Sequence, residues 1–230
     1  MAYSFVRENA AGTASPYTIT GAANGNILVL GFADFRSPAA RTISSLSTTN
    51  VTWSKLGGTT NGTMDAEIWL GVVSGGTSGT SITVTMSGTG ATLVMRAYEF
   101  GTPVGTGTPA ADGTFTTNTG TSVTPALGTF TPTESSNLKV GVAGWANGTT
   151  PSASPGGVWT AGTFTANSTV VGVQFIYDLI GSASSDSGSW TITSAAWVTV
   201  SGAITVPLPP GTWKSEYPDQ IFDRVGVVSY

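Results

Sequence analysis

Two glutamates, Glu67 in the stretch AEIWLG and Glu99 in AYEFG, come closest to a catalytic pair. Both stand in segments typical of β-strands, and glycosidases commonly use two carboxylates, one as the acid and one as the nucleophile or base. Aromatic neighbours would raise the pKa of such an acid. Yet Glu67 follows an Asn-Gly turn and Glu99 precedes a glycine, and both positions are typical of a solvated residue at a strand edge. A carboxylate at such a position discourages pairing with another strand. We favour this structural role and expect the protein not to be an enzyme.

The chain contains no histidine and no cysteine. It therefore has no imidazole or thiolate ligand for zinc or copper, no Ser-His-Asp or Cys-His nucleophile pair, and no disulfide. Aspartates in turns rich in Asn and Gly could offer oxygen ligands to calcium, but no run has the spacing of an EF-hand. We interpret them as turn caps and expect no metal and no cofactor. They are Asp34, Asp65, Asp112, Asp178 and Asp186.

Seven tryptophans offer flat surfaces on which sugar rings could stack. Most of them alternate with polar residues in strand-like segments, where a large aromatic residue is by default part of the core. Trp145, at the exit of such a segment, and Trp213, near the C-terminus, are the exceptions. Glycan binding at either stays open as an alternative. The full set is Trp53, Trp69, Trp145, Trp159, Trp190, Trp197 and Trp213.

Charge is scarce: charged residues make up 9% of the chain, and the net charge is −4. No cluster of Lys and Arg exists that could displace the counterions of DNA or RNA, so we expect no nucleic-acid partner. No apolar run is long enough to span a membrane, and the N-terminus lacks the pattern of a secretory signal. Thr and Ser hydroxyls must supply the polar surface, which is typical of an extracellular surface or of an assembled particle.

The pattern of apolar residues predicts an all-β protein. In SITVTMS (81–87) apolar residues alternate with Thr and Ser, as on a strand with one buried face. The continuous apolar run ILVLGFADF (27–35) predicts a central strand covered on both faces. Asn-Gly pairs at 24–25, 61–62 and 147–148 predict tight turns, because both residues tolerate positive φ.

The chain echoes itself after roughly 110 positions. GNILVLGFADF (25–35) resembles SNLKVGVAGW (136–145), and ATLVMRAYEF (91–100) resembles AAWVTVSGAITV (195–206). We expect two quasi-repeated halves, about 20–100 and 121–206, joined by the Gly/Thr/Pro-rich stretch 101–120. A half alone would have a marginal core. We therefore favour one jelly-roll-like antiparallel β-sandwich of about ten strands over residues 1–208, with the halves interleaved, rather than two tandem domains.

The order of these elements resembles a family of jelly-roll modules found in bacterial surface proteins and in virion proteins of tailed bacteriophages. The shared features are strand patterns, such as G-[DN]-x-L-V-V, x-T-W, x-I-W-x-G and T-V-T-x-S-G, and they cover about residues 20–208. The resemblance implies a head decoration protein or a minor tail component. Lack of a secretory signal favours the phage branch, because virion proteins assemble in the host cytoplasm.

The chain closes with LPPGTWKSEYPDQIFDRVGVVSY, which differs from everything before it. Proline ends the last strand, and residues 209–230 then form an arm that is rich in both charged and apolar side chains. Such a terminus is ordered only if something holds it, either its own sandwich or a neighbouring subunit. We favour the neighbour and expect the arm to bind a partner through Trp213, Tyr217, Ile221, Phe222, Val225, Val227 and Tyr230.

The expected function is therefore structural: a capsid decoration protein that binds the major capsid protein or other virion subunits, and that forms a homo-oligomer. The alternative is a module of a tail or cell-surface protein that binds carbohydrate or the host surface. An exposed row of aromatic side chains would favour the alternative, and an apolar patch around the arm would favour the structural role.

Overall fold

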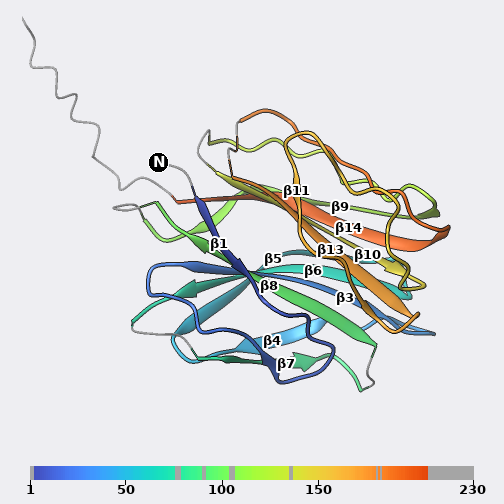
Figure 1. Cartoon of the computed structure of the whole chain (residues 1–230), viewed down its shortest axis with the longest axis horizontal. Helices are drawn as coiled ribbons and strands as arrows, with labels where there is room; N and C mark the ends of the chain where they lie inside the picture. The colour runs from blue at the N-terminus through green and yellow to red at the C-terminus, as the bar shows by residue number, and fades with distance from the viewer. Residues whose placement is uncertain are drawn as a thin grey trace, which may run out of the picture.

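The computed structural model describes residues 3–75, 79–89, 92–103, 107–134, 137–179, 181 and 183–206. This part of the chain contains β-strands and no helix, as the sequence predicts. Antiparallel sheets stack in layers, with a small sheet at the bottom of Figure 1 and two large sheets above it. The arm at 209–230, with all of its expected partner-binding residues, lies outside the described residues.

The first large sheet has the strand order β1-β8-β3-β6-β5. Its middle strand, β3, coincides with the continuous apolar run of the sequence, and all but the last of its residues are buried. Apolar side chains on both faces of one strand require cover on both sides, so β3 can only lie inside the stack. The strands are β1 (Ser4–Glu8), β3 (Ile27–Phe35), β5 (Val51–Thr60), β6 (Met64–Val73) and β8 (Leu93–Gly101).

The second large sheet has the order β11-β13-β10-β14-β9, with β12 also paired to β13. Here β10 takes the central position that β3 takes in the first sheet, and it is as deeply buried. The strands are β9 (Ala110–Ser122), β10 (Leu138–Ala146), β11 (Thr160–Ala161), β12 (Thr165–Asn167), β13 (Val171–Asp178) and β14 (Ala195–Thr205).

The small sheet, of order β2-β7-β4, covers the outer face of the first large sheet. Its middle strand, β7 (Ser81–Met86), has the alternation of buried and exposed residues that the sequence predicts: Ile82 and Val84 are buried, and Thr83 and Thr85 are exposed. The strands are β2 (Tyr17–Thr18), β4 (Ile43–Ser47) and β7 (Ser81–Met86). With these short strands the described chain has more strands than the expected ten or so.

Each large sheet takes its strands from one continuous half of the chain: the first contains β1, β3, β5, β6 and β8, and the second contains β9 to β14. The interleaving of halves that we expected therefore does not occur between these sheets. The halves meet face to face instead, so each half buries the apolar face of the other without exchanging strands.

The expected linker 101–120 is a second correction. Most of it forms β9, the longest strand of the described chain, which pairs with β14 from Ala110 to Ser122. Glycines and threonines suggested a loop, but Phe115 anchors the strand in the core between the sheets. Gly57 and Gly202 leave room for this side chain, because a Cβ on Gly202 would lie 2.6 Å from its ring and one on Gly57 would lie 2.8 Å from its Cβ.

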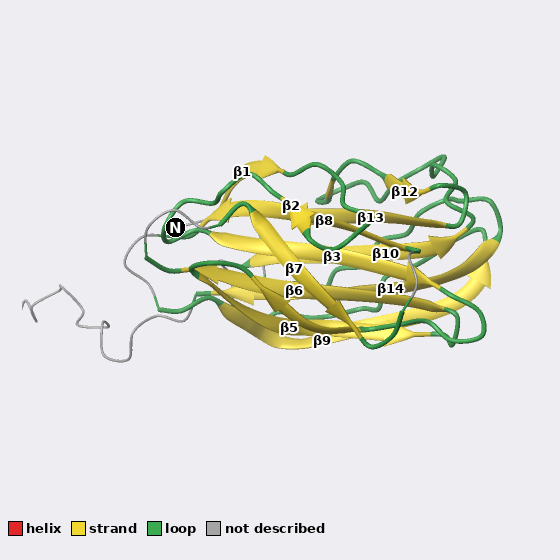
Figure 2. Ribbon diagram, turned by 90° about the horizontal axis from the view of Figure 1, so that it is seen from below, coloured by secondary structure: helices red, strands yellow, loops and turns green. Residues whose placement is uncertain are grey.

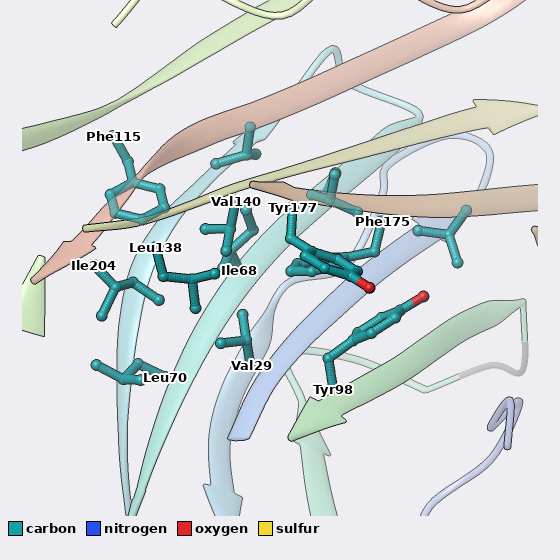
Figure 3. Packing of buried hydrophobic residues seen from close by; sticks show 14 of the residues in the cluster. Val29, Ile68, Leu70, Tyr98, Phe115, Leu138, Val140, Phe175, Tyr177 and Ile204 are labelled. Atoms are coloured by element: carbon teal, nitrogen blue, oxygen red, sulfur yellow. The ribbon is translucent and has the colours of Figure 1, made fainter. Parts of the chain in front are cut away.

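Three apolar clusters hold the layers together. The largest fills the space between the two large sheets, where Val29 and Leu70 face Val140 and Ile204 (Figure 3). A second lies between the first sheet and the small sheet. A third lies on the outer face of the second sheet, where loop residues such as Trp190 pack against the strands. Both faces of both large sheets are thus covered.

The three predicted Asn-Gly turns adopt the backbone conformation expected of them. Gly25 (φ 85°), Gly62 (φ 97°) and the pair Asn147 (φ 91°) and Gly148 (φ 54°) all have positive φ. These values are strained for most L residues, so the turns are fixed locally by the residue types.

Candidate functional site

Four carboxylates lie on the face of the first sheet that the small sheet covers. Asp34 of β3, Asp65 and Glu67 of β6, and Glu99 of β8 have at most 1% of their surface exposed. Asp34 and Asp65 are direct neighbours across the β3–β6 ladder. Burying charge without a partner is costly, so the partners of each carboxylate determine what the cluster can do.

Asp34 is paired with Arg41, which reaches it from the loop after β3 and is itself 3% exposed. The guanidinium contacts both carboxylate oxygens, through Nη2 at 2.5 Å and Nε at 3.2 Å. The backbone N–H of Arg41 also donates to Asp34, at 3.0 Å. This bidentate contact provides hydrogen-bond partners for both oxygens of a carboxylate that is almost fully removed from solvent.

Glu67 is held by three donors. Lys55 of the edge strand β5 forms an ion pair with it at 2.9 Å, the indole N–H of Trp69 donates to Oε2 at 2.5 Å, and the Ile43 N–H donates to Oε1 at 3.0 Å. The last contact joins the first sheet to β4 of the small sheet. Glu67 therefore connects two layers of the fold.

Glu99 has an equivalent position on β8. Arg7 of β1 forms an ion pair with it at 2.6 Å, and Oε1 accepts hydrogen bonds from the Ala23 N–H at 3.0 Å and the Asn26 amide at 2.5 Å. These contacts fix the turn before β3 and the edge strand β1 to β8.

The structure therefore corrects our interpretation of Glu67 and Glu99 as solvated strand-edge residues, because both are fully buried. It also shows that they do not face each other as a catalytic pair would. They project from the same sheet face, on strands separated by β3, with Glu67 opposite Phe32 and Glu99 opposite Leu28. Their oxygens are engaged by protein groups that hold the layers together.

Asp65 is the member of the cluster without an ion-pair partner among the described residues. Its Oδ2 is buried and accepts no hydrogen bond in this part of the chain. Burial, followed by the neighbouring Glu67 carboxylate, raises the pKa of Asp65 from 3.8 to about 8. Three cations thus balance three carboxylates, and the fourth carboxyl carries a proton at neutral pH.

We expect the stability of the protein to fall as the pH rises because of Asp65. The folded protein holds this proton more tightly than the unfolded chain, so it binds more protons than the unfolded chain between about pH 4 and pH 8. Each pKa unit in this window corresponds to about 1.4 kcal/mol. Asp65→Asn keeps the shape of the neutral acid, and should be more stable than the wild type at pH 8 by about 4–5 kcal/mol.

Urea unfolding at pH 5 and at pH 8 measures this difference. Glu134→Gln, at an exposed carboxylate, is the matched control and should keep the wild-type pH dependence. An equal loss of stability between pH 5 and pH 8 in the wild type and in Asp65→Asn would rule out a buried protonated Asp65.

The second sheet has polar contacts that sequence reasoning treated as simple turn caps. Burial would raise the pKa of Asp112, but hydrogen bonds from Thr133, Glu134 and Asn137 hold it below its usual value. The bond from the Thr133 N–H is 3.0 Å long and ties β9 to the segment before β10.

Lys139, which is 1% exposed, forms an ion pair with Asp186 and donates to the Ser184 carbonyl at 3.3 Å. Asp178 lies opposite Lys139 in the β10–β13 ladder and is also buried. No group of three or more acidic residues within the described ranges is arranged to hold a metal ion.

A further polar contact, which no pattern in the sequence indicates, joins the two large sheets at one edge. Glu8 at the end of β1 forms an ion pair with Arg96 and accepts hydrogen bonds from Thr163, through its N–H at 3.0 Å and its hydroxyl at 3.1 Å. The Tyr98 hydroxyl donates to the same carboxylate at 3.2 Å. Burial, followed by the Glu8 charge, raises the pKa of Tyr98, so its hydroxyl remains a donor.

The tryptophans are mostly core residues, as predicted, but Trp145 is a correction. We kept it as a candidate platform for a sugar, whereas it is fully buried and stacks on Phe164 with ring centroids 5.2 Å apart. Its indole N–H donates to the Thr149 carbonyl at 2.9 Å. A covered ring cannot receive a ligand. Trp213, the other candidate, lies outside the described residues, and Trp53 on the edge strand β5 is half-buried.

A shallow hollow of the described surface lies over residues 10–18. Alanines, Gly12, threonines, Pro16 and the Tyr17 ring line it, and it contains no charged side chain. Its lining offers neither a nucleophile nor a cluster of donors.

Searches against family models, curated proteins and solved structures find no match to this chain. The resemblance to virion modules therefore rests on the strand patterns of the sequence. Within the described ranges there is no helix that is long and apolar enough to cross a membrane.

Proposed function

We propose that the protein is a non-catalytic structural component of a bacteriophage virion, and specifically a decoration protein of the assembled capsid. The observation that carries the proposal is where the charges lie. Among the described charged residues, Lys55 and Glu134 are exposed, and the others are partly or fully buried. A soluble protein that remains free usually maintains a charged surface. A surface of Thr, Ser and Asn suits contact with other subunits.

The resemblance to jelly-roll modules belongs to the same proposal, and the strand order lends it support. The order β5-β6-β3-β8 in the first sheet corresponds to β11-β13-β10-β14 in the second, and two of these pairs, β3 with β10 and β8 with β14, are the segments that echo each other in the sequence. We infer that the two sheets are quasi-repeated halves of one module over residues 1–208.

The arm is the proposed contact with the particle. β14 ends at Thr205, at the same end of the sandwich at which β1 begins (Figure 1), and residues 209–230 follow. The arm's apolar side chains, Trp213 and Phe222 among them, bind a neighbouring copy or the major capsid protein. A protein that binds only the assembled shell stabilises that shell by mass action. The protein then acts in the virion, after assembly in the host cytoplasm.

Light scattering and co-sedimentation test the proposal. The full-length chain should be an oligomer and should sediment with assembled shells from the same genome, but not with the unassembled capsid protein. A chain ended after Leu208 should form particles with fewer copies than the full-length chain, should keep its thermal stability, and should not sediment with shells. Trp213→Ala with Phe222→Ala is the milder variant and should weaken both properties.

The proposal would be wrong if the full-length chain and the chain ended after Leu208 were both monomers and neither sedimented with assembled shells. Retention on immobilised polysaccharide in that case would favour the alternative, a module that binds carbohydrate or a host surface through Trp213.

A further inference from the structure

The sheets of this protein end in strands that differ in how well they are protected against pairing with another chain. Charges, bulges and shortness are the usual protections. β1 is short and has a bulge between Phe5 and Arg7, and β5 contains Lys55 and a bulge beside it. β4 has a bulge, while β2, β11 and β12 have no more than three residues each.

The edge strand β9 has an irregular register between Asp112 and Thr116, but from Thr116 to its end it lacks these protections. From Thr116 to Ser122 it pairs with β14 in a regular register, residue for residue, and its other side has no strand partner among the described residues. This stretch, TTNTGTS, contains neither a charged residue nor a proline. Thr117, Asn118, Thr119 and Thr121 are exposed, and Figure 2 shows β9 along the rim of the molecule beside β5.

The absence of charge indicates which partner this edge fits. When a strand pairs antiparallel with a second copy of itself, a charged residue at or close to the two-fold axis lies near the same charge on the other copy. The 116–122 stretch brings no such repulsion. Its side chains are also too polar to bind through an apolar surface, so the main-chain hydrogen bonds of an added strand are the interaction that it offers.

We propose that β9 pairs antiparallel with β9 of a second copy of this chain, centred on Thr119, and so joins the two six-stranded sheets into one continuous sheet. The Thr119 N–H donates to the side-chain oxygen of Asn118 at 2.9 Å. The partner's carbonyl replaces this oxygen as the acceptor. Formation of the pair does not depend on the arm, and it supplies a dimer whether or not the protein binds a capsid.

The chain has no cysteine, which allows a direct geometric test in the full-length protein. Residues opposite each other in an antiparallel pair have Cα atoms about 4.5–5.5 Å apart, which is within the range that a disulfide spans. Thr119→Cys should therefore give a covalent dimer on mild oxidation. Thr52→Cys, at an exposed position of the protected edge β5, is the matched control and should remain a monomer on a denaturing gel.

A second variant tests the same edge without cross-linking. Thr117→Lys with Thr119→Lys places four lysines at the two-fold contact, and should halve the mass measured by light scattering without changing the thermal unfolding of the sandwich. Thr52→Lys with Ser54→Lys, the same change on β5, should keep the wild-type mass. The wild-type mass itself should be at least twice the 23.2 kDa of one chain.

A wild-type mass of 23.2 kDa at high concentration would overturn the β9 contact. So would an unchanged mass in Thr117→Lys with Thr119→Lys, or cross-linking of Thr52→Cys as fast as Thr119→Cys. If removal of the arm lowers the mass and the β9 lysines do not, the arm forms the oligomer and the β9 pair is wrong. If the β9 lysines lower the mass and removal of the arm does not, the β9 pair forms the oligomer and the arm does not have its proposed role.

Discussion

Arg41→Met is expected to lower the free energy of unfolding by about 3–5 kcal/mol, because it leaves the Asp34 carboxylate buried without its cation. Arg41 and Asp34 are 3% and 0% exposed, so water cannot replace the lost contact without opening the layer between the small sheet and the first large sheet. Methionine preserves much of the length of the arginine side chain. The loss therefore measures the charge pair more than the packing.

Equilibrium unfolding in urea measures this change, and two further variants make the result specific. Asp34→Asn combined with Arg41→Met removes both charges and should recover more than half of the loss, since the unpaired charge is then gone. Arg36→Met, at a partly exposed arginine of the same loop, should cost less than about 1 kcal/mol. If Arg41→Met were no more costly than Arg36→Met, the buried pair would not contribute to stability.

Gly144→Ala is expected to lower the free energy of unfolding by about 2–3 kcal/mol through overpacking between the two large sheets. A Cβ at Gly144 would lie 2.7 Å from the Cβ of Ala33 on the facing sheet, closer than two carbon atoms can approach. Both atoms are attached directly to the backbones of central strands, β10 and β3. Neither can rotate away, so the sheets themselves must separate.

A methyl exchange between the sheets provides the matched test. Gly144→Ala with Ala33→Gly moves the methyl group from one sheet to the other, and should recover most of the stability that Gly144→Ala loses. Gly156→Ala, where a Cβ would meet nothing within 4 Å, should change the stability by less than about 0.5 kcal/mol. If Gly144→Ala cost no more than Gly156→Ala, the close approach of the sheets would be wrong.

The elements set by local residue patterns could be predicted. The apolar run at 27–35 is β3, the alternation in 81–87 is β7, and the three Asn-Gly pairs adopt positive φ. In each case the residues themselves carry the physical reason, either the period of side chains along a strand or the backbone freedom of Asn and Gly.

β9 and the assignment of strands to sheets could not be predicted in this way. The Gly- and Thr-rich stretch 101–120 has little apolar periodicity, and most of it forms a strand because β14 and the space around Phe115 are available to it. The echo between the halves was visible in the sequence, but it did not reveal that each half makes a sheet of its own.

Residue types and their spacing were enough to predict an all-β, charge-poor chain without thiolate or imidazole chemistry. The burial of Glu67 and Glu99 and the covering of Trp145 arise only when the sheets pack together. The physical reason is that burial of a charge depends on which cation arrives beside it. Glu99 is paired with Arg7 from the far end of the same half, and no local pattern encodes a contact between residues so distant in the chain.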